Sequence, residues 1–180
     1  MEECLIRTER LELRRWRDED RAPFAQMGQD PEVMRHFPSL LTKTQSDAMI
    51  DERFEAHFDQ HNFGFWALER RSDRCFLGFA GISKVGFQCP IEGQVEIGWR
   101  LARHAWGQGF AFEAASAAMN YGFGHLGLDR IVAMTVIGNE RSRRLIAKLG
   151  MARAPEWDFD HPRVPAGSPV RPQIVYSRNR

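Results

Sequence analysis

The segment from His104 to Ala111 contains two glycines, Gly107 and Gly109, between an alternating apolar segment and a run of small helix-forming residues. A strand, a glycine bend and a helix in this order direct unpaired backbone N–H groups, and the partial positive charge of the helix start, at an anion. Glycine also lets a phosphate approach the main chain. The segment therefore indicates the floor of a phosphate-containing cofactor site. The alternative is a tight turn that needs glycine only for its geometry.

Two common phosphate-binding motifs do not fit this segment. A dinucleotide fingerprint needs a small residue where the chain has Phe112, and no acidic residue closes the next strand to hold a ribose. A P-loop needs Gly-Lys followed by Ser or Thr, and these residues are absent here. What remains is a glycine-spaced bend before a helix.

The tail carries another group of chemically active side chains, Asp158, Asp160 and His161. Two carboxylates beside a histidine could bind an amine or relay a proton, if the end of the chain returns to the substrate cleft next to the cofactor site. The alternative is a turn built from Asp and Pro. The other histidines are scattered and lack ligand spacing, so we predict no metal site.

Periodicity gives the elements that must position these residues. Alternation over residues 5–16 predicts a strand with Leu11 and Leu13 on one face and Glu12 and Arg14 on the other. Ile50, Phe54 and Phe58 form the stripe of a helix. Helices are predicted at about 18–28, 30–37, 44–62, 107–126 and 139–150, and strands at 63–69, 75–83, 82–88, 95–101, 130–137 and 173–177.

Composition limits the class of protein. The 180 residues predict one domain, 1–180, with a substantial core. Hydrophobic residues make up 43% and charged residues 27%, and the formal net charge is +1, which argues against disorder and against a nucleic-acid partner. Cys4, Cys75 and Cys89 are far apart, so we expect reduced thiols. No stretch is long and apolar enough to span a membrane, and we expect a cytoplasmic protein.

Several motifs together resemble the GNAT superfamily of acetyl-CoA-dependent N-acetyltransferases, in particular its ribosomal-protein N-terminal acetyltransferase branch. The resemblance spans about residues 5–151, in order and at family spacing. It is carried by Thr8–Arg14, Asp30–Met34, Glu96–Leu101, Trp106–Ala114, Asn139 with Ser142, and Lys148–Met151.

The resemblance implies an α/β fold of the GNAT type. We expect a twisted mixed sheet of about six to seven strands, helices on both faces, and a V-shaped splay between two central strands. Pantetheine of acetyl-CoA would pair with the first of these strands, and the pyrophosphate would bind the loop. The implied cofactor-binding residues are Trp99, Arg100, Leu101, His104, Trp106, Gly107, Gln108, Gly109, Phe110, Ala111, Asn139 and Arg144. Where relatives usually carry Gln or Arg, this chain has His104.

The resemblance also implies the catalytic residues. Glu96 resembles the strand glutamate that acts as the base, and its alternative role is an ion pair, with Arg100 as one partner. Many superfamily members carry a Tyr acid where this chain has Ile146, so Ser142 is the candidate proton donor, with helix capping as its alternative. Arg141, Arg143 and Arg144 form a basic cluster that could meet the 3′-phosphate of coenzyme A, with a solvated face as the alternative.

These features predict an N-acetyltransferase in which a primary amine attacks acetyl-CoA directly in a ternary complex. The acceptor could be a protein N-terminus or a small-molecule amine. The alternative is a catalytically silent module that binds an acyl-CoA. The expected partners are acetyl-CoA and the amine, with neither nucleic acid nor membrane, and a homodimer is conceivable if the last strand offers a free edge.

Overall fold

The computed structural model describes residues 6–180, so Cys4 and the predicted strand start at Leu5 lie outside the described residues. The strands are β1 (Ile6–Arg7), β2 (Leu11–Arg14), β3 (Phe65–Arg70), β4 (Phe76–Lys84), β5 (Val95–Leu101), β6 (Arg130–Thr135), β7 (Ala152–Arg153), β8 (Phe159–Asp160) and β9 (Pro172–Asn179). The helices are α1 (Asp18–Gln29), α2 (Lys43–Ala48), α3 (Ala56–His61), α4 (Phe110–Gly124) and α5 (Glu140–Lys148). A π-helical segment, η1 (Met49–Glu55), joins α2 to α3, and two short 3₁₀ turns are η2 (Arg103–Ala105) and η3 (Pro155–Trp157).

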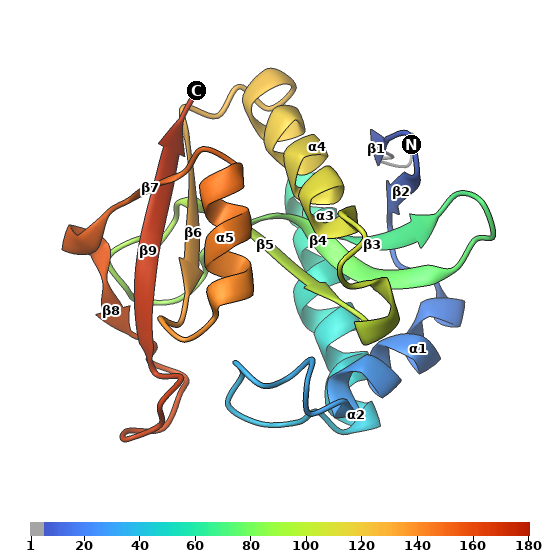
Figure 1. Cartoon of the computed structure of the whole chain (residues 1–180), viewed down its shortest axis with the longest axis horizontal. Helices are drawn as coiled ribbons and strands as arrows, with labels where there is room; N and C mark the ends of the chain where they lie inside the picture. Colours follow the sequence, from blue (N-terminus) through green and yellow to red (C-terminus); the bar gives the residue numbers. More distant parts are fainter. Residues whose placement is uncertain (1–5) are drawn as a thin grey trace.

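One mixed sheet organises the molecule, as Figure 1 shows. Its order is β1-β2-β3-β4-β5-β6-β9-β7, and β8 also pairs with β9. The sheet has 9 strands rather than the predicted six to seven. The first alternating segment forms two strands of a hairpin, and β7 and β8 have two residues each, too short to show periodicity. Because β9 pairs with β6 on one side and with β7 and β8 on the other, it offers no free edge for a homodimer.

The two central strands β5 and β6 diverge. β4 and β5 pair along their length, from Lys84 opposite Val95 to Gly78 opposite Leu101. In contrast, β5 and β6 run parallel and pair only at Glu96 opposite Val132. Figure 1 shows β5 turning away from β6 beyond this point. The predicted V-shaped splay is confirmed, and Glu96 lies where the strands meet.

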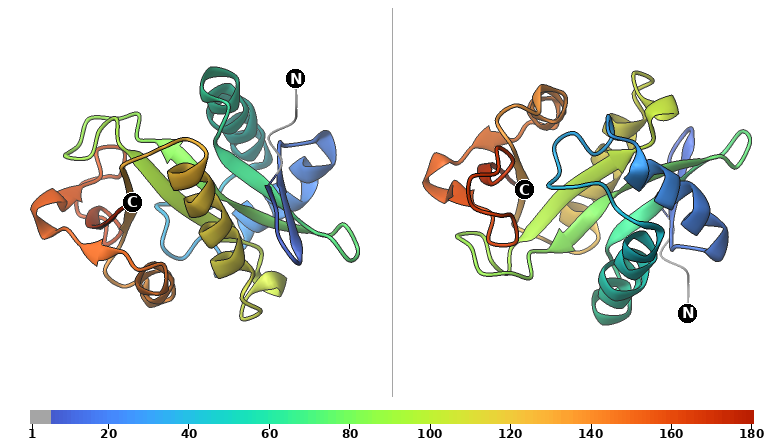
Figure 2. Two further views of the ribbon diagram at one scale, coloured as in Figure 1. Left: turned by 90° about the horizontal axis from the view of Figure 1, so that it is seen from above. Right: turned by 90° about the horizontal axis from the view of Figure 1, so that it is seen from below.

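Helices cover both faces of the sheet, as the two views of Figure 2 show. α4 lies on the sheet through its predicted small-residue face, in which Ala114, Ala118 and Gly122 are buried. A Cβ at Gly122 would lie 2.9 Å from Ile131 Cδ1, so a larger residue there would have to displace the end of the Ile131 side chain. The opposite face carries α1, α2, η1 and α3, with the aromatic core residues Trp16, Phe24, Phe54, Phe65 and Phe79 packed between them and the sheet.

Two helix predictions are wrong in detail. The segment at 31–39 forms turns instead of the predicted helix at 30–37: one i→i+4 hydrogen bond, from the Met34 N–H to the Asp30 carbonyl, is followed by an i→i+3 bond from the Phe37 N–H to the Met34 carbonyl, and Pro38 prevents continuation. The next helix is capped by Thr42, whose side chain accepts a hydrogen bond from the Gln45 N–H, two residues before the predicted start at Thr44. The helix still ends as predicted, with Asn62 in the left-handed conformation.

The first long strand buries a charge that alternation had placed on the solvent face. Arg14 is only 3% exposed. Its Nε donates to Glu69 at 2.8 Å, and its Nη1 and Nη2 donate to Asp20 at 2.7 and 2.9 Å. A periodic pattern does not show that helix α1 covers this face of the sheet and brings Asp20 with it.

Candidate active site

The glycine loop after β5 exposes a run of unpaired donors. Gly107 and Gly109 have φ angles of 74° and 82°, a left-handed conformation that favours glycine. Gly109 is the N-cap of α4 and supplies no side chain to the helix start. Within the described residues, the backbone N–H groups from Gly107 to Phe112 have no acceptor. The loop therefore has a row of unpaired backbone donors at the place where the sequence predicted an anion site.

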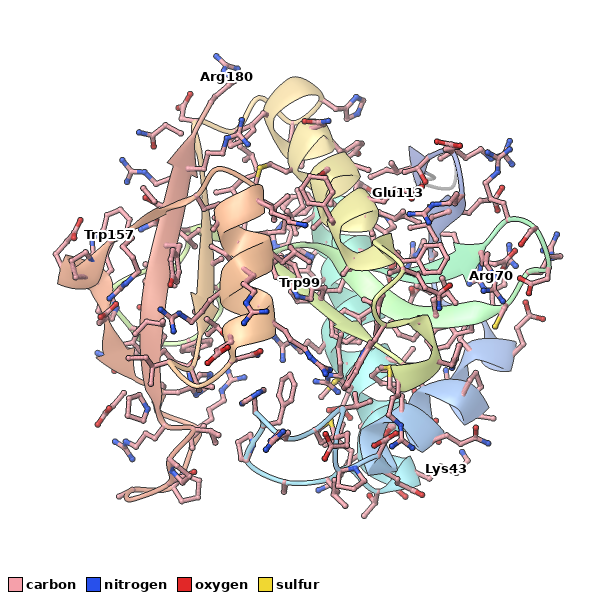
Figure 3. All side chains as sticks on the ribbon, viewed as in Figure 1. Lys43, Arg70, Trp99, Glu113, Trp157 and Arg180 are labelled. Carbon is pink, nitrogen blue, oxygen red and sulfur yellow. The ribbon has the colours of Figure 1, made fainter. Side chains whose placement is uncertain are left out.

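Hydrogen bonds from Thr8 and Arg10 of the N-terminal hairpin to Gln108 and Glu113, here called the clasp, hold this loop in place. Arg10 Nη1 donates to the Gln108 carbonyl at 2.9 Å, and Arg10 Nε donates to Glu113 Oε2 at 2.7 Å. Glu113 also accepts hydrogen bonds from the Thr8 hydroxyl and the Arg10 N–H. Figure 3 shows Glu113 on the side of α4 that faces the hairpin. Sequence analysis noted Thr8–Arg14 as a motif but did not detect this clasp, because it joins residues far apart in the chain.

Side chains of the loop make internal contacts. His104 Nε2 lies 3.8 Å from Cys75 Sγ, and the His104 carbonyl accepts a hydrogen bond from Gln108 Nε2 at 2.8 Å. Trp106 Nε1 donates to the Leu101 carbonyl at 2.8 Å, and the Arg141 guanidinium lies 4.5 Å from the Trp106 ring centre. The starts of α4 and α5 are thus linked across the end of β5.

Three residues of β5 that follow the splay point, Trp99, Arg100 and Leu101, pair with β4 but not with β6. Their edge toward β6 is available for an extended ligand to add to the sheet. Figure 3 labels Trp99 on this part of the strand.

Glu96 is the buried carboxylate at the meeting point of the strands. It is 8% exposed, and burial raises its pKa above the ordinary value for a glutamate, while the charge of Arg53 partly opposes this rise. Arg53 Nη2 lies 3.7 Å from Glu96 Oε1, so the predicted pairing with Arg100 is replaced by one with Arg53. Sequence analysis missed Arg53, which η1 presents to the site.

Asn139 and Ser142 open α5 as expected for a helix start. Asn139 Oδ1 accepts a hydrogen bond from the Ser142 N–H at 3.2 Å. The Ser142 side chain is half-buried, and its hydroxyl makes no hydrogen bond among the described residues. The cap is therefore Asn139, which leaves the Ser142 hydroxyl available to a ligand.

The basic cluster on α5 divides among three environments. Arg144 is exposed and pairs with Glu140 at 2.9 Å. Arg143 Nη1 donates to the Ile137 carbonyl at 3.1 Å, which closes the turn before the helix. Arg141 lies over Trp106, as described above.

The tail residues do not act as one group. Asp158 pairs with Arg153 and accepts the Val175 N–H, and Asp160 pairs with Arg171, so both carboxylates support the local structure. The His161 ring lies 4.6 Å from the Phe87 ring centre, and burial, followed by the charges of Arg163 and Arg53, lowers its pKa. The Arg53 charge that acts on His161 is the one that lies beside Glu96.

The described residues contain neither a cluster of metal ligands nor a membrane-spanning helix. No group of three or more His, Cys, Asp or Glu side chains could hold a metal ion. No helix among residues 6–180 has the length and apolar character needed to cross a membrane.

Comparison with known proteins agrees with this geometry. The N-acetyltransferase YoaA of Bacillus subtilis, itself uncharacterized, is 33% identical over 152 residues, which cover 83% of each chain. A GNAT-family acetyltransferase structure from Bacillus anthracis superimposes with a TM-score of 0.78 at 24% identity, covering 97% of this chain and 98% of that one. RimL, a ribosomal L7/L12 alpha-N-protein acetyltransferase solved with coenzyme A, has a TM-score of 0.75 at 14% identity and 97% coverage of both chains. Residues 10–152 match the family model described as Acetyltransferase (GNAT) domain, and the chain therefore belongs to the GNAT acetyltransferase family.

Proposed function

We propose that this GNAT acetyltransferase transfers an acetyl group from acetyl-CoA to a primary amine, by direct attack in a ternary complex. The observation that carries the proposal is the splay of β5 and β6, with buried Glu96 where the strands meet and unpaired loop donors at the far end of β5. One strand thus supports a proton acceptor at one end and an anion cradle at the other.

The donor-binding residues follow from these contacts. The loop N–H groups from Gly107 to Ala111 would hold the pyrophosphate, and the free edge of Trp99–Leu101 would pair with the pantetheine arm. Asn139 would contact the arm while it caps α5. Arg144, exposed beside Glu140, would meet the 3′-phosphate. His104 contributes through its backbone, since its side chain contacts Cys75.

Two side chains would move the protons. Glu96 would accept a proton from the amine, directly or through water, because its raised pKa suits a base that works near neutral pH. Ser142 would donate a proton to the leaving thiolate, since its hydroxyl has no other partner among the described residues. The amine gains the C–N bond as the thioester C–S bond breaks. No covalent acetyl-enzyme is needed.

The competing hypothesis is a module that binds an acyl-CoA without transferring the acyl group. Release of the CoA thiol from acetyl-CoA, measured against N-terminal peptides, polyamines, amino acids and aminoglycosides, separates the two. A transferase releases CoA only with an acceptor, and Glu96→Gln slows that release by about 10²- to 10⁴-fold. Acetyl-CoA binding with no release for any amine would refute transfer and favour the silent module.

A further inference from the structure

Arg100 is a buried arginine without a counter-charge. It lies on the same face of β5 as Glu96 and Gly98, and its side chain is 7% exposed. None of its nitrogens donates a hydrogen bond within the described residues, and Nε and Nη1 are fully enclosed. Its guanidinium lies 4.2 Å from the ring centre of Phe37 and 5.3 Å from that of Phe79. Burial, followed by the charge of Arg53, lowers its pKa to about 9.

Arg14, in strand β2 of the same sheet, is a buried arginine whose charge is balanced by the chain itself. Arg14 is as buried as Arg100, yet Asp20 and Glu69 satisfy all three of its nitrogens. Leaving a buried charged group unpaired costs several kcal/mol in general, so unpaired groups are rare outside functional sites. Arg100 therefore lacks a hydrogen-bond acceptor within the described part of the chain, and a bound ligand could supply one.

The position of Arg100 indicates which ligand supplies that partner. The unpaired loop donors proposed for the pyrophosphate begin at Gly107, beyond the end of β5. The Arg100 side chain instead lies on the face that carries Glu96, with Phe65 covering Gly98 between them: a Cβ at Gly98 would lie 3.0 Å from the Phe65 ring. Phe37, which covers Arg100, is 37% exposed and belongs to the turns at 31–39. A ligand group bound at Arg100 would therefore lie on the same face of β5 as the Glu96 carboxylate.

We propose that the Arg100 guanidinium binds a carboxylate of the acceptor, and that the acceptor is therefore a small amine that also carries a carboxylate, such as an amino acid. This inference rests on the proposed function, since it assigns the substrate class of that site. Arginine presents its donors in a planar fork that matches a carboxylate. A carboxylate that displaces the half-exposed Phe37 ring would give the enclosed Nε and Nη1 the acceptors that an aromatic ring does not provide.

Matched acceptors test the inference. CoA release is measured for amino acids and ω-amino acids against their carboxamides, and for phosphoethanolamine against ethanolamine. The wild-type protein should favour the carboxylate member in kcat/KM by about 10- to 100-fold, and Arg100→Met, which alters the side chain but not the backbone edge proposed for pantetheine, should reduce the ratio of the two rates to about 1. The control is Arg7→Met, an exposed arginine of β1 paired with Glu12, which should keep the wild-type preference. Equal rates for the pairs, or a preference for the phosphate, would overturn the carboxylate assignment.

A binding readout separates this inference from the transferase proposal. Thermal shift of the CoA-bound protein with each standard amino acid requires no turnover. The wild-type protein should be stabilised by at least one amino acid and not by its carboxamide, and Arg100→Met should lose that response. Turnover of amines without such binding overturns the inference alone, whereas carboxylate binding without turnover of any amine overturns only the transferase.

The stability of the unliganded variant tests the alternative that Arg100 is structural. Replacing an unpaired buried charge with an apolar side chain of similar length is often neutral or stabilising. Arg100→Met should therefore have an unchanged or higher Tm. A fall in Tm of more than about 4 °C would mean that stacking on Phe37 and Phe79 holds the fold together, and would overturn the ligand role.

Discussion

Arg53 Nη2 lies 3.7 Å from Glu96 Oε1, across the face of the sheet on which η1 packs. Two effects act on the Glu96 carboxyl in opposite directions: burial raises its pKa, and the Arg53 charge lowers it. Arg53 itself is half exposed, with 51% of its side chain accessible, so its charge is partly screened. The pair leaves Glu96 able to bind a proton without the tight geometry of a structural salt bridge.

Removing the Glu96 carboxylate should lower kcat and leave the affinity for acetyl-CoA unchanged. Glu96→Gln keeps the shape of the side chain but cannot accept a proton, so kcat should fall by about 10²- to 10⁴-fold. The Kd for acetyl-CoA should stay unchanged, because the loop donors lie at the other end of β5. Steady-state kinetics and calorimetry measure the two effects. Glu19→Gln, an exposed carboxylate of α1, is the matched control, and wild-type kcat in Glu96→Gln would rule out the base.

Replacing Arg53 should shift the dependence of kcat/KM on pH. The base works when ionised, so kcat/KM rises as pH rises through the raised pKa of Glu96. Arg53→Met removes the charge that lowers this pKa, so the acid limb of the profile should shift to higher pH. A profile of kcat/KM against pH for both proteins checks the direction. An acid limb that stays in place or moves to lower pH would show that Arg53 does not act on the base.

Local patterns predicted the elements around the site, whereas contacts between distant residues were not predictable. The stripe of Ile50, Phe54 and Phe58 follows from four-residue spacing, which helix geometry fixes. The loop glycines and the Asn139 cap follow from residue type, since glycine favours positive φ and asparagine favours helix starts. The contact of Arg53 with Glu96 depends on the π-helical turn, which changes the direction of every later side chain in that helix and has no sequence signature.

Charges were the least predictable feature of the sheet. Alternation alone placed Arg14 toward solvent and offered Arg100 as a partner for Glu96. The structure buries both arginines: helix α1 covers Arg14, and Phe37 from the turns at 31–39 covers Arg100. The packing of α1 on the sheet gives Arg14 its carboxylate partner Asp20, whereas no element among the described residues brings a carboxylate to Arg100. This packing depends on the whole fold and cannot be read from one strand.

The hydroxyl of Ser142 can be tested apart from helix capping. Ser142→Ala preserves the N–H that donates to Asn139, so the free energy of unfolding should change by less than about 0.5 kcal/mol. Loss of the proton donor should lower kcat by about 10²-fold or more. Asn139→Ala is the contrasting variant, because loss of the cap should cost about 1 kcal/mol. Ser142→Ala with wild-type kcat would remove the serine from the mechanism.

The conformation of the loop can be tested at Gly109. Alanine there must adopt a φ of 82° and place its Cβ 3.4 Å from Arg10 Nη2, so Gly109→Ala should lower stability by about 1–2 kcal/mol and weaken coenzyme A binding. Gly124→Ala is the control: its Cβ would meet nothing within 4 Å in α4, and stability should stay equal or rise by about 0.5–1 kcal/mol. Thermal unfolding and calorimetry with coenzyme A are the measurements. Unaltered affinity in Gly109→Ala would argue against the loop as the anion site.

The same substitution should have opposite effects at the two buried arginines. Arg14→Met leaves Asp20 and Glu69 buried without their cation, so the free energy of unfolding should fall by about 3–5 kcal/mol, whereas Arg100→Met leaves no charge behind. Urea denaturation measures both. Arg15→Met, whose partners Glu55 and Asp59 remain partly exposed, should lose only about 1 kcal/mol. Equal losses at Arg14 and Arg100 would mean that the chain stabilises both charges, and would leave no unpaired group to attract a ligand.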